Sequence, residues 1–200
     1  MYDLDLEVVD RRNPNDAGGV EPLPLSVEDV AGLVAHTLIV ADVPEGIIEG
    51  GVSFVSVETI AELNSEHRGI AGPTDVLSFP IDQLDELQAD LPRQLGDVMI
   101  CPAYVAGQVA DGSTMVTDDG DAVGEEHHDG GSSAGVGQQQ RSSDTDVRSA
   151  LARCVVHGTL HALGFDHERS AEAQAQMFAL EELALSEWRD NVHEVWSDEA

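Results

Sequence analysis

The most informative stretch of this sequence is HGTLHALGFDH, residues 157–167. His157 and His161 are four residues apart, so on a helix both imidazoles project from the same face. Gly164 permits the left-handed turn that ends a helix, and the chain can then return His167 toward the other two histidines. Three imidazoles leave one position of a tetrahedral zinc ion open for water, which is typical of a catalytic site. We therefore predict one zinc ion per chain, bound by these three histidines.

The sequence on either side of this stretch predicts a mixed α/β fold. Apolar residues at helical spacing extend the histidine helix back to Val147, and the same spacing predicts a last helix at about 171–188. Alternating or apolar stretches predict four short strands, at 4–9, 51–57, 76–79 and 98–101. Three further helices are expected after Ser26, after Thr59 and from Pro102. The expected architecture is a mixed sheet of about four strands, with residues 4–9 at an edge, covered by about five helices. Its central helix carries a metzincin-like zinc motif.

One segment breaks this pattern. From 111 to 146 the apolar periodicity disappears and Gly, Ser, Asp and Gln dominate. The segment holds nine acidic residues and one arginine. Such a composition cannot bury a core. We predict a single domain, residues 1–200, that carries a flexible acidic insertion at 111–146.

The charge balance restricts the possible partners. The chain has 39 acidic residues, nine arginines and no lysine, and its formal net charge is −30. This charge repels phosphate backbones over most of the surface, so any nucleic-acid site must be local. The acidity fits either a solvated acidic coat or a high-salt cytoplasm. Two cysteines, no apolar stretch of roughly 18 residues and no signal peptide at the N-terminus predict a cytoplasmic protein without a membrane span.

A second motif lies upstream of the histidines. Arg68 falls where a predicted helix ends in a glycine-containing loop, and the strand 76–79 follows. A guanidinium at such a position can bind a phosphate through two hydrogen bonds, but it can equally be an ordinary surface arginine. We expect Thr74 and Asp75 to close the turn before the strand. Asp166 is a candidate to hydrogen-bond a ligand imidazole.

Together these motifs resemble the YbeY family of bacterial endoribonucleases. The resemblance rests on Asn64, Arg68, PTDVLSFP at 73–80, LGDV at 95–98 and the histidine block at 157–167. It implies a mixed α/β fold, one zinc bound by the three histidines, single-stranded RNA as substrate and a catalytic role for Arg68. It also implies action in 16S rRNA 3′-end maturation and ribosome quality control, with rRNA precursors and ribosomal subunit proteins as partners. The sequence departs from the family in its acidic insertion and in Ala162, where the family has a bulkier aliphatic residue.

Two other interpretations stay open at this point. The histidine spacing also matches metzincin peptidases, but Gly158 stands where those enzymes carry their glutamate base. A metallopeptidase would have to recruit Glu66 or Glu168 instead. A ribosome-assembly factor with a structural zinc would need a fourth protein ligand, and only Asp166 offers itself. For RNA cleavage, the sequence does not separate attack by a zinc-activated water from attack by the 2′-hydroxyl, and it leaves the oligomeric state unknown.

Overall fold

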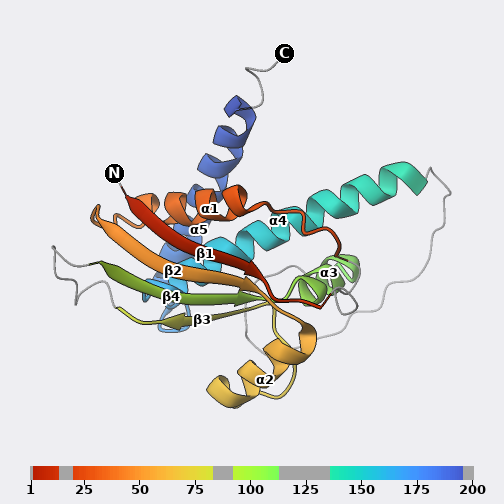
Figure 1. Ribbon diagram of the computed structural model, residues 1–200, viewed down its shortest axis with the longest axis horizontal. Helices are drawn as coiled ribbons and strands as arrows, with labels where there is room; N and C mark the ends of the chain where they lie inside the picture. The colour runs from red at the N-terminus through yellow and green to blue at the C-terminus, as the bar shows by residue number, and fades with distance from the viewer. Residues whose placement is uncertain (1, 14–19, 83–91, 113–135, 196–200) are drawn as a thin grey trace.

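The computed structural model describes residues 2–13, 20–82, 92–112 and 136–195. These residues form four strands and five helices, as the sequence predicts (Figure 1). In chain order the elements are β1 (Asp3–Asp10), α1 (Val27–Val40), β2 (Ile47–Phe54), α2 (Val57–Arg68), β3 (Val76–Pro80), β4 (Arg93–Ile100), α3 (Pro102–Ala110), α4 (Val136–Ala162) and α5 (Ala171–Val195).

The strands form one mixed sheet in the order β1-β2-β4-β3. β1 pairs parallel to β2, and β2 pairs parallel to β4. β3 pairs antiparallel to β4 and is an edge strand, in line with the proline that ends it. The predicted edge position of residues 4–9 is also confirmed, because β1 lies at the other end of the sheet.

Two apolar clusters hold the helices to the sheet. The larger one joins α1, α4 and α5 to one face of the sheet, and Figure 1 shows these three helices together on that side. Its fully buried residues include Leu33, Val98, Leu160 and Met177. The smaller cluster consists of Val55, Ile60, Leu77 and Cys101, and it attaches α2 beside β3. The sheet and α4 therefore form the centre of the molecule, with α2 at its margin.

Several predicted boundaries were wrong, each for a local reason. The N-cap of α2 is Ser56 rather than Thr59, because the Ser56 hydroxyl accepts the Thr59 backbone N–H at 3.2 Å. β2 begins at Ile47, since a register shift between Glu49 and Gly50 carries the strand through its glycine pair. β4 begins at Arg93, whose buried guanidinium donates to the Pro44 carbonyl oxygen at 2.7 Å.

The histidine helix is also longer than predicted. α4 begins at Val136 rather than Val147, so residues 136–146 of the expected insertion are helical. Glutamine and arginine are good helix formers even where no apolar face needs burial, which explains how this helix continues without periodicity. The rest of the predicted insertion, 113–135, lies outside the described residues. Among the helices that are described, none is long and apolar enough to span a membrane.

Candidate metal centre

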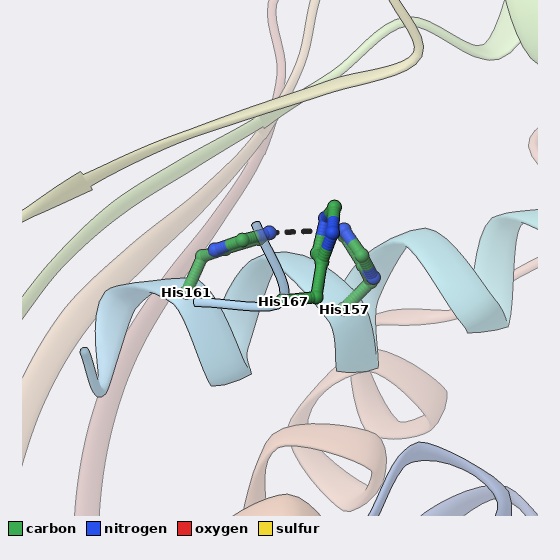
Figure 2. Close-up of side chains that lie close together, drawn as sticks. All are labelled: His157, His161 and His167. Atoms are coloured by element: carbon green, nitrogen blue, oxygen red, sulfur yellow. Dashed lines mark hydrogen bonds between the residues drawn. The ribbon is translucent and has the colours of Figure 1, made fainter. Parts of the chain in front are cut away.

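The three predicted histidines come together at the C-terminal end of α4. His157 and His161 project from the same face of the helix, and the helix ends at Ala162. Gly164 follows with φ +91°, a conformation that favours glycine, and its N–H donates to the His161 carbonyl oxygen at 2.9 Å. The turn returns His167 over the helix, so the three rings converge (Figure 2).

The geometry of this cluster fits a metal ion. One potential ligand atom from each histidine lies within 4.8 Å of the others, and the Nε2 atoms of His157 and His161 are 3.1 Å apart. Burial, and then the neighbouring His157 and His167, lower the pKa of His161 to about 4. His161 is therefore neutral at pH 7 and has a nitrogen lone pair available for a metal. Within the described part of the chain, no fourth His, Cys, Asp or Glu joins this group, so a tetrahedral ion held by the three histidines would keep one position for water or substrate.

A buried glutamate that the sequence analysis missed orients the first histidine. Glu181 on α5 is 1% exposed, and its Oε2 lies 3.1 Å from His157 Nδ1. With its proton on Nδ1, the His157 ring donates to this carboxylate, and Nε2 keeps its lone pair for a metal. The Arg153 guanidinium donates to the other Glu181 oxygen and also to Glu182. The carboxylate is thus held between two donors.

Asp166, the predicted partner of a ligand imidazole, does something else. Its carboxylate accepts the Glu168 backbone N–H at 3.0 Å and the Arg169 Nε–H at 3.1 Å, so it shapes the loop that carries His167. The sequence did contain a pattern that points to Glu181. In that pattern, Glu181 places one carboxylate on the apolar face of α5, which also carries Met177, Ala184 and Trp188.

Arg68 shares a cleft with the histidines. The cleft has a volume of about 630 Å³, and both the end of α2 and the histidine cluster line it. α2 ends at Arg68 because Gly69 adopts the left-handed conformation, with φ +71°. The Arg68 guanidinium lies 3.8 Å from the Glu168 carboxylate. An arginine and three metal-ligand candidates therefore face the same space.

Four other arginines lie near these motifs in the sequence, and two of them reach the cleft. Arg153 and Arg169 line the cleft, each in an ion pair with an acidic residue. Arg93 and Arg148 lie elsewhere and are held by backbone carbonyls of other loops. The cleft is therefore not a basic groove, because each of the three arginines that line it already faces a carboxylate.

Gly158, the position of the peptidase base, faces the sheet. A Cβ at this position would lie 2.5 Å from Val98 Cγ1 and 3.0 Å from Val76 Cγ2. The Gly158 carbonyl oxygen also accepts the Ser78 hydroxyl at 2.8 Å. Because α4 crosses β3 and β4 at this point, a glutamate side chain has no room there. Glu66, one of the two substitute bases considered, is not among the residues that line the cleft, whereas Glu168 is.

The turn before β3 is built as expected. The Asp75 carboxylate accepts the Thr74 hydroxyl at 3.0 Å and the Val76 N–H at 2.8 Å. These contacts close the turn and fix the first residue of the strand. Both side chains nevertheless lie on the cleft, so the turn also forms part of its lining.

Comparison with known proteins gives a family match that covers the residues of this site. The family model described as endoribonuclease YbeY matches residues 26–119 and 132–189, which include Arg68 and the whole histidine block. The chain belongs to the YbeY family. The match omits only 120–131 between its two parts, so the segment foreign to the family is shorter than the predicted insertion.

This chain covers different shares of the length of individual YbeY relatives. The endoribonuclease YbeY of Corynebacterium glutamicum is 32% identical over 150 residues, 72% of this chain, and the chain spans 60% of that relative. The relative from Corynebacterium jeikeium is 31% identical over 186 residues, which cover 90% of this chain and 82% of the relative. The solution structure of TM1509 from Thermotoga maritima aligns over 93% of both chains at 22% identity, with a TM-score of 0.44.

Proposed function

We propose that this chain is a zinc-dependent endoribonuclease that cleaves single-stranded RNA, with His157, His161 and His167 as zinc ligands and Arg68 as the catalytic arginine. The observation that supports this most is the shared cleft, because Arg68 and the three-histidine group line the same space. Membership of the YbeY family supports the same reaction. Zinc is the metal that three imidazoles and an open position fit best.

Each residue has a defined task in this proposal. A zinc ion held by the histidines would supply a Lewis acid for the phosphodiester. Arg68 binds the scissile phosphate with its planar fork and stabilises the negative charge that develops on it. Glu168 holds the Arg68 side chain over the cleft until the phosphate takes its place. Glu181 keeps His157 in the tautomer that binds metal.

The biological role we propose follows the family. The chain would act in the cytoplasm on rRNA precursors, in 16S rRNA 3′-end maturation and ribosome quality control, in contact with ribosomal subunit proteins. A peptidase is the less favoured alternative, because Gly158 has no room for the usual glutamate base.

The test combines metal analysis with cleavage of labelled RNA. The zinc-loaded protein should cleave single-stranded RNA, spare a duplex of the same sequence and leave casein intact. Arg68→Ala should keep its zinc and lose about 100-fold or more of the rate, as expected when one donor to the transition-state charge is removed. Arg68→Lys should also be strongly impaired, since one ammonium cannot replace a planar fork. His161→Ala should lose the zinc.

Arg189→Ala is the matched control, because Arg189 is an exposed arginine of α5 that does not line the cleft. It should leave the rate unchanged. Equal rates for wild type and Arg68→Ala would remove Arg68 from the mechanism. Casein hydrolysis without RNA cleavage would replace the proposal by a metallopeptidase.

A further inference from the structure

Two rings in an edge-to-face arrangement, His67 and Phe79, line the cleft beside Arg68. The ring centroids of His67 and Phe79 are 4.8 Å apart, with an interplanar angle of 72°, and both residues line the cleft. The chain has eight Phe, Tyr and Trp residues, and three of them, Phe79, Tyr104 and Phe165, line this one cleft. Aromatic rings and histidines are the side chains on which unpaired RNA bases stack.

The unpaired edge of β3 lies beside these rings. Cys101 donates its N–H to the Asp75 carbonyl oxygen at 2.8 Å, so residues 75, 77 and 79 are the ones that bond to β4. The peptide N–H and C=O of Ser78 therefore point away from β4, toward the side where no described strand pairs. Ser78 lines the cleft, and its hydroxyl is already bonded to Gly158. One amide donor and one acceptor are thus presented to a ligand.

The charge of the chain indicates what kind of ligand can gain most here. The net charge is −30, and Arg68, Arg153 and Arg169 each face a carboxylate within the cleft. Contacts to phosphate therefore provide less of the binding energy than in a basic RNA-binding protein. A nucleobase is uncharged, and its stacking and hydrogen bonds do not depend on the overall potential of the protein.

We propose that His67, Phe79 and the peptide group of Ser78 form a subsite for one unpaired nucleobase, next to the phosphate held by Arg68. This inference rests on the proposed endoribonuclease activity and extends it to base recognition. It also gives single-strand specificity a structural cause. A base inside a duplex has both faces stacked and its hydrogen-bonding edge paired, so it cannot occupy the subsite.

The experiment compares two RNA oligonucleotides that differ only in whether the nucleotide beside the cleavage site carries its base or is abasic. Stacking of one base contributes about 1–3 kcal/mol, so removing the base should lower kcat/KM of the wild type by roughly 5- to 150-fold. His67→Ala should lower kcat/KM on the intact RNA by a similar factor and show little further loss on the abasic RNA. His67→Phe should retain the activity. His67 is exposed, so these variants should fold.

His36→Ala is the control, because His36 lies on α1 and does not line the cleft. It should lose as much as the wild type does when the base is removed. If the wild type cleaves both oligonucleotides equally, the subsite is refuted while the proposed activity stands. If no single-stranded RNA is cleaved by the zinc-loaded protein, both fail. If His67→Ala weakens the binding of an extended peptide but not of RNA, the subsite binds peptide strands instead.

Discussion

Replacing Glu181 by glutamine should weaken metal binding although the substitution changes neither size nor shape. The carboxylate lies between two donors, the Arg153 guanidinium and the Nδ1–H of His157. A glutamine offers one acceptor oxygen and one NH₂ group, so it can accept from only one of them. If the stronger charged donor, Arg153, keeps the oxygen, the NH₂ group faces His157 Nδ1.

The tautomer of His157 then decides the outcome. An NH₂ group opposite Nδ1 favours the form with its lone pair at Nδ1 and its proton at Nε2, and that form cannot bind a metal through Nε2. Loss of such an orienting partner typically costs 10- to 100-fold in metal affinity. We expect Glu181→Gln to weaken zinc binding by about that factor, which corresponds to roughly 1.4–2.8 kcal/mol.

Zinc affinity can be measured by competition with a chromophoric chelator at pH 7.5. Glu182→Gln is the matched control, because Glu182 also binds Arg153 but its side chain is 60% exposed, against 2% for Glu181. It should leave the affinity within about twofold, as expected of an exposed ion pair. An unchanged zinc affinity in Glu181→Gln, or an equal loss in Glu182→Gln, would refute the proposed role of Glu181.

Three further predictions concern stability. Gly158→Ala should destabilise the fold by about 1–3 kcal/mol, because its Cβ meets the sheet, while Gly107→Ala on α3, with nothing within 4 Å of its Cβ, should not lower the melting temperature. Deletion of 120–131, which the family model does not match, should leave the melting temperature nearly unchanged; a large fall would show that the segment contributes to the fold. The pKa of His161 falls from 6.5 unfolded to about 4 folded, so the unfolded metal-free chain takes up the proton first as the pH drops between these values. Denaturant titrations should therefore show a stability loss of about 3 kcal/mol between pH 6.5 and 4 that His161→Asn lacks, at about 1.4 kcal/mol per pKa unit; an identical pH dependence in the two proteins would contradict it.

The sequence was sufficient for the residues whose geometry is local. The spacing of His157, His161 and Gly164 predicts their convergence with His167, because a helix and its terminating turn leave little freedom. The number of strands and helices followed from apolar patterning in the same way. The sequence did not reveal the residue from another helix that orients His157. Glu181 comes from another helix, and only the packing of α5 against α4 brings it to His157.

The predicted starts of β4 and α4 were wrong because they lie among polar residues, which apolar patterning does not assign to a strand or a helix. Arginine is usually a surface residue, yet Arg93 is buried at the start of β4. Its guanidinium is stabilised there by a hydrogen bond to the Pro44 carbonyl oxygen, a contact that the sequence does not reveal. The first turns of α4 have no apolar face and were therefore predicted as a flexible loop. Absence of apolar periodicity in a sequence therefore does not exclude a helix. The grouping of Arg68, Arg153 and Arg169 around one cleft likewise depends on how α2, α4 and the loop after α4 are arranged, and sequence spacing does not reveal it.

The hydrogen bond from Ser78 to Gly158 has a mechanical consequence. It joins β3 to α4 one residue after His157, so the strand and the two helical histidines should behave as one stiff unit. α2 has a looser attachment: its buried residues are Ile60 and Asn64, and Gly69 and Gly72 follow it with φ of +71° and +105°. Arg68 is thus on the compliant side of the cleft. A ligand that spans both sides should tighten the site by drawing α2 inward, and amide hydrogen exchange should slow in 57–72 while it stays constant in 155–161.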